Sequence, residues 1–220
     1  MIAHVVDPKI IDISPLVSVD TAVFPGDTPL SQKTLCDFKT GQSFKLSTIT
    51  STVHLGAHAD APSHYHAEGE DISERNLAMY YGKAQVIEIK KPRGMPIQIE
   101  DLADKPILAP RILFKTLSYP QPDHWNSDFN SLSPELIEHL HLKGVFLVGI
   151  DTPSIDLAGE KILKTHHQVY QRNFAILEGL VLDHVAEGLY TLCALPLKLR
   201  NFEASPVRAV LLDTYKDSST

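Results

Sequence analysis

The most informative stretch of this chain reads His54-Leu55-Gly56-Ala57-His58-Ala59-Asp60-Ala61-Pro62-Ser63-His64. It brings three imidazoles and one carboxylate into eleven residues, and neither of the two cysteines lies nearby. Nitrogen and oxygen ligands suit zinc or manganese, and a site without thiolates is more typical of catalysis than of a structural zinc. Eleven histidines in 220 residues could also cluster by chance on a solvated loop. No lysine or arginine interrupts residues 53–73, however, which favours a metal site.

The backbone around Gly56 has to curl if these side chains share one ion. On a straight strand His54 and His58 would lie about 13 Å apart, at about 3.3 Å per residue, which is near the limit for two imidazoles on one metal. Gly56 permits unusual backbone angles, and Pro62 ends regular strand pairing. We therefore expect a strand to leave its sheet at about Val53 and to wrap these side chains around a metal.

The composition restricts the classes of protein to which this chain can belong. With 220 residues, 43% of them hydrophobic and 21% charged, the chain is expected to form a single domain over residues 1–220. A net charge of −7 and basic residues without a dense run argue against nucleic-acid binding and favour a small-molecule substrate. Residues 1–8 lack the pattern of a signal peptide, and no later window resembles a membrane span, so we expect a cytoplasmic protein.

The chain alternates predicted strands and helices, which indicates an α/β fold with a mixed central sheet and few helices. Helices are expected at Ser133–Leu140, where a serine cap precedes a proline at the first helical position, and at Glu160–Arg172. Strands are expected at Ile10–Val17, Phe44–Val53, Ala84–Ile89, Arg111–Lys115, Gly144–Asp151, Phe174–Leu177, Tyr190–Leu197 and Val207–Thr214. The strand Phe44–Val53 runs into the histidine stretch and should deliver the site.

A second cluster is predicted around Glu178. This carboxylate lies in an apolar run, where burial is costly unless it is paired or bound to metal. His166, on the helix before it, can lie beside it. If Asp60 bridges two ions about 3.5–4 Å apart, then His54, His58 and Asp60 hold one ion, while Asp60, His166 and Glu178 hold the other. Such a pair of ions would share one hydroxide.

This assignment of ligands to two ions does not use His64. An unperturbed imidazole pKa of about 6.5 suits it to move a proton to a leaving nitrogen. It could instead be a structural neighbour or a fourth ligand. His167 and His66 are expected to face solvent.

The histidine stretch and several other motifs resemble those of a known family. The pattern His-x-Gly-x-His-x-Asp-x-Pro-x-His is similar to the signature of the metal-dependent cyclase-like hydrolases, and among them it looks nearest to bacterial kynurenine formamidases (arylformamidases). The similarity continues in order along nearly the whole chain, at Pro25-Gly26-Asp27-Thr28-Pro29, Gly149-Ile150-Asp151-Thr152-Pro153-Ser154, Ala175-Ile176-Leu177-Glu178-Gly179, Leu195-Pro196-Leu197-Lys198 and Ala204-Ser205-Pro206-Val207-Arg208-Ala209.

The resemblance implies a cyclase-like domain of the swivelling β/β/α type with a barrel-like sheet. It implies two zinc ions per subunit, or manganese, held by the same two sets of ligands, with His64 as acid and base. The implied reaction is hydrolysis of N-formyl-L-kynurenine to L-kynurenine and formate in tryptophan degradation, through a metal-bridged hydroxide. It also implies a homodimer or larger homo-oligomer.

The substrate pocket departs from the family pattern at Phe24. The family usually has a tryptophan before the Pro-Gly-Asp turn, so an aromatic wall remains here without the indole N–H. Phe24 is the expected substrate contact, with Tyr80 or Tyr81 as weaker candidates for stacking. Arg208 or Lys198 could meet a substrate carboxylate.

Two other functions remain open. One is another amide hydrolase of the same superfamily, such as an isatin hydrolase, with manganese as the alternative metal. The other is a non-catalytic protein in which the metal is structural. A serine hydrolase is disfavoured because the sequence contains no Gly-x-Ser-x-Gly elbow.

Overall fold

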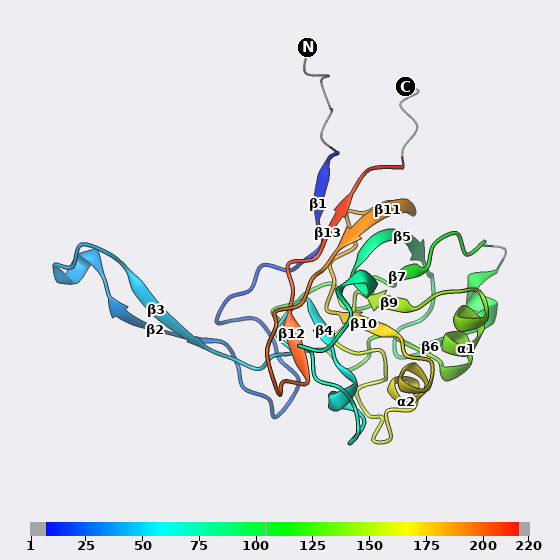
Figure 1. Ribbon diagram of the computed structural model, residues 1–220, viewed down its shortest axis with the longest axis horizontal. Coiled ribbons are helices and arrows are strands. Elements are labelled where there is room, and N and C mark those ends of the chain that lie inside the picture. The colour runs from blue at the N-terminus through cyan, green and yellow to red at the C-terminus, as the bar shows by residue number, and fades with distance from the viewer. Residues whose placement is uncertain (1–7, 104, 216–220) are drawn as a thin grey trace, which may run out of the picture.

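A curled, mixed sheet forms the body of the computed structural model, which describes residues 8–103 and 105–215 (Figure 1). Its strand order is β1 (Ile10–Asp12), β13 (Val210–Leu212), β11 (Gly188–Cys193), β5 (Tyr81–Glu88), β7 (Arg111–Lys115), β9 (Leu147–Ile150), β10 (Ala175–Glu178), β4 (His58–Asp60) and β12 (Ala204–Pro206). The strands β5, β7, β9 and β10 are parallel, and the other pairs are antiparallel. The predicted α/β class with a barrel-like sheet and few helices is confirmed.

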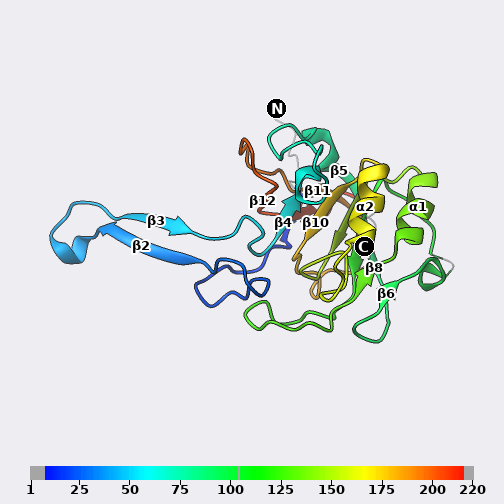
Figure 2. The same ribbon diagram turned by 90° about the horizontal axis from the view of Figure 1, so that it is seen from below.

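Two α-helices lie side by side on one face of this sheet, α1 (Pro134–Leu142) and α2 (Lys164–Gln171) (Figures 1 and 2). The cap predicted for the first is present, because the Ser133 hydroxyl oxygen accepts a hydrogen bond from the Leu136 N–H. The smaller elements are the parallel pair β6 (Pro96–Ile97) and β8 (Ser131–Leu132) and 3-10 turns at Phe38–Thr40, Pro62–His64, Leu77–Met79 and Ile99–Leu102.

The central strands bury both faces. Val86 and Leu113 pack in the hydrophobic cluster on the concave side, while their neighbours Ile87 and Phe114 pack in the cluster beneath the helices. This arrangement explains why these strands have nearly continuous apolar sequences instead of alternating ones.

The strand predicted at Phe44–Val53 exists as the shorter β3 (Leu46–Thr50), which ends before the histidine stretch and does not belong to the nine-stranded sheet. Among the described strands β3 pairs only with β2 (Ser31–Cys36), and the two form an arm that projects from the body (Figures 1 and 2). β-Branched residues favour a strand whether or not it is buried, so composition did not reveal its partner. Two of the predicted metal ligands, His58 and Asp60, instead lie on the short strand β4, after the turn at Gly56.

Similarly, the strand predicted at Ile10–Val17 is only β1, three residues long. Pro15 follows soon after it and lacks the N–H that would extend the pairing. Residues 1–7, on which the expectation about a signal peptide depends, lie outside the described part. Within that part, none of the helices has the length and apolar character needed to cross a membrane.

Candidate metal centre

Three elements bring the predicted ligands together at one end of the sheet. The strands β4 and β10 are antiparallel neighbours, so His58 lies opposite Glu178 and Asp60 opposite Ile176. Helix α2 adds His166, which is 2% exposed. The site thus lies where the parallel strands β9 and β10 reach their carboxyl ends, a common location for binding sites in α/β folds.

The predicted curl of the backbone is confirmed. Gly56 has φ +60° and carries its carbonyl oxygen back to accept a hydrogen bond from His58 Nδ1 at 2.9 Å. The His54 and His58 rings consequently lie only 5.0 Å apart, centroid to centroid. Gly179, with φ +64°, packs closely against this turn. A Cβ at residue 179 would lie 2.2 Å from the Gly56 oxygen, so only glycine fits there.

Asp60 lies at the centre of the cluster. Its Oδ1 is 3.0 Å from His54 Nδ1 and 3.5 Å from His58 Nε2, and its Oδ2 is 3.5 Å from His166 Nε2. Burial opposes ionisation, but the surrounding imidazoles hold the pKa of Asp60 well below its usual range. Asp60 is therefore an anion shared by three histidines.

Glu178 closes the other side of the cluster. Its Oε2 lies 3.3 Å from His58 Nε2 and its Oε1 lies 3.6 Å from His166 Nε2. Burial alone would lower the pKa of both imidazoles, but Glu178 and Asp60, together with Asp156 at His166, raise it to about 9 for His58 and about 10 for His166. The buried carboxylates therefore favour the protonated form of both rings.

The donor atoms at the centre of this cluster fit a metal ion. The Nε2 atoms of His54, His58 and His166 and both oxygens of Asp60 are buried and have no hydrogen-bond partner among the residues that the structure describes. Buried polar atoms are rarely left in this state. When neutral, His58 donates from Nδ1 to a backbone carbonyl, and its Nε2 lone pair then points to the centre. Nitrogen and oxygen donors in this number suit zinc or manganese.

Two groups of these atoms are close enough to hold an ion, with their ligand atoms within 4.8 Å of one another. They are His54, Asp60 and His64, and His58, Asp60 and Glu178. Both contain Asp60, as the predicted bridge would require. They place His54 with His64 instead of with His58, so the division of ligands between two ions stays a prediction.

Asp156 is a further carboxylate at the site that sequence reasoning missed. Its Oδ2 lies 2.7 Å from His166 Nδ1, and its two oxygens also accept hydrogen bonds from the N–H groups of Thr165 and His166 at the start of α2. It thereby directs His166 Nε2 towards the centre. The available signal was an aspartate shortly before a predicted helix, which favours capping.

We expect Asp156→Asn to weaken metal binding by about 10–100-fold, because an amide orients the imidazole without raising its basicity. Competition with a chromophoric chelator measures the affinity. Asp183→Asn is the matched control, since Asp183 contacts the exposed His184 in the same way at 2.9 Å. Equal affinities for the two variants would contradict this role for Asp156.

His64 stands at the exposed edge of the cluster. Its ring lies 4.3 Å from that of His54 and 5.9 Å from that of His166, centroid to centroid. Partial desolvation lowers the pKa of His64, so the ring is neutral at pH 7 and able to accept a proton. His167 is exposed, as predicted, whereas His66 is half-buried and stacks on Tyr170 at 3.8 Å outside the cluster.

A cavity of about 590 Å³ opens over the cluster, and His54, His58, His64 and His166 line it. Its volume lies within the usual range for small-molecule sites, about 300–1,000 Å³.

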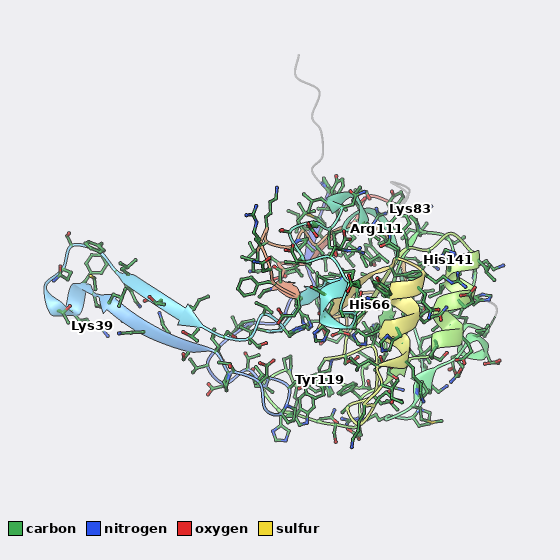
Figure 3. All side chains as sticks on the ribbon, turned by 60° about the horizontal axis from the view of Figure 1, so that its bottom comes forward. Lys39, His66, Lys83, Arg111, Tyr119 and His141 are labelled. Atoms are coloured by element: carbon green, nitrogen blue, oxygen red, sulfur yellow. The ribbon has the colours of Figure 1, made fainter. Side chains whose placement is uncertain are left out.

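The aromatic wall of this cavity comes from two loops. Phe24 lines it, as predicted, and meets Trp125 edge-on at 4.8 Å between centroids. Trp125, the only tryptophan in the chain, and Tyr119 (labelled in Figure 3) were missed, because their loop carries no motif. Lys161 also lines the cavity.

The weaker substrate candidates were wrong. Tyr80 is fully buried in the core, and Tyr81 lies on β5 away from the cavity. Arg208 forms an exposed ion pair with Asp12. Lys198 is exposed and does not line the cavity. Residue type alone could not reveal these positions.

Comparison with known proteins agrees with this geometry. The Cyclase family model, described as "Putative cyclase", matches residues 11–157, which include the histidine stretch. The chain therefore belongs to the Cyclase family.

Solved structures extend the likeness to almost the whole chain. A "potential metal-dependent hydrolase with cyclase activity" is 26% identical, with 94% of this chain and 99% of that chain covered and a TM-score of 0.82. A "predicted metal-dependent hydrolase" from Bacillus stearothermophilus is 27% identical, with 93% and 98% covered and a TM-score of 0.79. Isatin hydrolase A from Labrenzia aggregata, bound to benzyl benzoate, shares the fold at 21% identity, with 94% of each chain covered and a TM-score of 0.81. The family and the first two relatives support the class of metal-dependent hydrolase over a non-catalytic metal-binding protein.

Proposed function

We propose that this protein is a cytoplasmic arylformamidase that hydrolyses N-formyl-L-kynurenine to L-kynurenine and formate in tryptophan degradation. One observation carries the proposal. Histidine and aspartate atoms that have no hydrogen-bond partner in the described structure lie at a cavity whose wall is aromatic. The cluster suits hydrolysis, and the wall suits an aryl substrate.

Two zinc ions, or two manganese ions, would be held by His54, His58, Asp60, His166 and Glu178. A metal held there would supply Lewis-acid chemistry, which polarises a carbonyl and lowers the pKa of water towards neutral pH. The protein contributes four buried residues of this set, His58, Asp60, His166 and Glu178, and the Gly56 carbonyl oxygen orients the His58 ring.

His64 supplies the proton transfer. As a neutral imidazole it takes a proton from the attacking water and returns it to the aryl nitrogen when the carbon–nitrogen bond breaks. The hydroxyl joins the formyl carbon to give formate, and the nitrogen leaves as the arylamine. His64 is suited to this role because its ring is exposed at the cavity, whereas His58 and His166, which also line the cavity, are only 2% exposed.

The aryl ring of the substrate would lie against Phe24 and Trp125. Trp125, on a different loop of the same wall, would offer the indole N–H donor that Phe24 lacks. Lys161 would meet the carboxylate of the amino-acid side chain, since it is the lysine that lines this cavity.

We expect Lys161→Ala to raise KM for N-formyl-L-kynurenine about tenfold and to leave kcat nearly unchanged, because the lost ion pair binds a part of the substrate remote from the reaction. Steady-state kinetics measures both constants. Lys198→Ala, a change of another exposed lysine outside the cavity, should have no effect. A drop in kcat with unchanged KM would contradict this contact.

A second candidate substrate is a cyclic aryl amide such as isatin. Phe24, Tyr119 and Trp125 would accept either ring, and isatin needs no cationic partner. Comparison of kcat/KM for the two substrates decides between them. Under the formamidase proposal N-formyl-L-kynurenine is preferred and the preference falls in Lys161→Ala, whereas preference for isatin in both proteins would favour the cyclic amide.

A further inference from the structure

Asp151 is a buried carboxylate at the edge of the cavity that the proposed reaction does not use. It follows directly after β9, within the motif at residues 149–154, and it lines the cavity although it is only 6% exposed. Burial raises the pKa of Asp151, because the carboxylate loses the water that would stabilise its charge. A buried acidic group in this position needs hydrogen-bond donors. The identity of its donors therefore indicates its role.

The donors to Asp151 belong to one turn. The Thr116 nitrogen lies 3.0 Å from Oδ1 and 2.9 Å from Oδ2, and the Thr116 hydroxyl donates to Oδ1 at 2.6 Å. The Leu117 N–H donates to Oδ2 at 2.8 Å. Because β7 and β9 are parallel neighbours, Thr116 and Asp151 leave the sheet side by side. The carboxylate thus pairs the first N–H groups that follow strand β7.

The turn that Asp151 holds has a strained backbone. Leu117 has φ +56°, a left-handed conformation that residues with a Cβ rarely adopt. Its side chain is 47% exposed, so packing does little to impose this conformation. Strained backbone persists where the surrounding structure holds it, and it is concentrated at functional sites. The hydrogen bond from the Leu117 N–H to Asp151 supplies that constraint here.

Hydrogen bonds connect this turn to both ends of the loop that forms the aromatic wall. The hydroxyl oxygens of Thr116 and Ser118 lie 2.8 Å apart at the start of the loop. The Ser118 hydroxyl oxygen also accepts a hydrogen bond from the Asn130 N–H, at 2.9 Å, where the loop ends. Between these contacts the loop carries Tyr119 and Trp125, which line the cavity (Tyr119 is labelled in Figure 3). The anchored turn therefore closes the base of this loop.

The aromatic side chains of the loop pack on one another. Phe129 is fully buried, and its ring lies 6.1 Å from that of Tyr119 and 6.0 Å from that of Trp125, centroid to centroid. Trp125 in turn meets Phe24 from the other loop of the wall. A displacement of the turn would consequently shift several rings of the wall together.

We propose that Asp151 is a positioning residue that fixes the aromatic wall of the cavity by anchoring the turn at residues 116–118. It acts through the loop and not on the substrate, since both of its oxygens already accept hydrogen bonds from that turn. Its consequence for catalysis rests on the proposed function, in which an aryl ring lies against this wall. The anchoring itself does not depend on the substrate.

Asp151→Asn tests the anchoring without any substrate. Because both oxygens accept hydrogen bonds, the amide NH₂ of asparagine would face an N–H or hydroxyl donor in either orientation. Trp125 is the only tryptophan in the chain, so acrylamide quenching of its fluorescence reports on the loop. The quenching constant is expected to rise about twofold as the half-buried indole becomes more accessible. An unchanged constant in the folded variant would overturn the proposal.

Asp71→Asn is the matched control. Asp71 accepts hydrogen bonds from the N–H and the hydroxyl of Ser73, at 2.7 and 2.6 Å, and from the Asn201 N–H at 2.7 Å, but it does not line the cavity. It should leave the fluorescence of Trp125 unchanged. An equal rise in the two variants would contradict a specific anchor at Asp151.

A second pair of variants decides the question if Asp151→Asn does not fold. Thr116→Val removes the hydroxyl that donates to Asp151, whereas Thr116→Ser keeps it. Only the valine variant is expected to raise the quenching constant. Equal constants in these two variants would overturn the proposal.

Steady-state kinetics and elemental analysis measure the consequence for catalysis. Asp151→Asn is expected to lower kcat/KM for N-formyl-L-kynurenine about tenfold, chiefly through KM, and to keep its full metal content. Loss of metal, or a loss confined to kcat, would place Asp151 at the reacting atoms and overturn the positioning role. If the wild type does not hydrolyse this substrate, the proposed function fails, and the fluorescence of Trp125 still decides whether Asp151 anchors the wall.

Discussion

Asp60→Asn is expected to abolish metal binding and to reduce hydrolysis by about 10³-fold or more. Asp60 is the residue common to both groups of candidate ligands, and both of its oxygens are buried with no hydrogen-bond partner in the described part of the chain. Asparagine keeps the shape but removes the charge and one oxygen donor. A metal contributes several kcal/mol to the transition state of such a reaction, and about 4 kcal/mol corresponds to 10³-fold. Elemental analysis of the purified variant and its rate under saturating zinc measure the two effects.

The control for this prediction is Asp128→Asn, which removes an exposed carboxylate paired with Arg93. It should keep both the metal and the activity. Full metal content in Asp60→Asn would contradict the central position assigned to this carboxylate, even if activity were lost.

His64→Ala is expected to lose about 10²–10⁴-fold in kcat while the protein keeps its metal, because the variant lacks the group that moves the proton but retains the buried donors. The measurement combines metal content with kcat. His64 also belongs to one group of candidate ligands, with His54 and Asp60. The metal content of the variant therefore distinguishes a proton carrier from a metal ligand.

His66→Ala provides the control, two residues further on and outside the cluster. Loss of metal from His64→Ala would show that His64 is a ligand, and the proton transfer would then need another group. Retained metal with full activity would leave His64 without either role.

The fold was largely predictable where a segment is buried on both faces. Arg111–Lys115 is apolar except at its ends, and the strand has these same bounds. The helix after Ser133 was predictable from its cap. The arm was not, because threonine and serine in β3 favour a strand without saying that it lies outside the sheet.

The candidate ligands were predictable because a carboxylate or imidazole in an apolar context needs a partner, as Glu178 does. Trp125 and Lys161 were not predictable as site residues, and the sequence signal at Asp156 indicated only a helix cap. Their contributions to the site arise from loops that come together only in the folded chain. Phe24 was found through the resemblance, not through its own pattern.

The most direct test of the central claim is the release of L-kynurenine from N-formyl-L-kynurenine by the purified protein, before chelation, after chelation and after zinc is restored. The account predicts rapid turnover that disappears on chelation and returns with zinc. Turnover that survives complete removal of the metal, or a metal-loaded protein that leaves this substrate untouched, would contradict it.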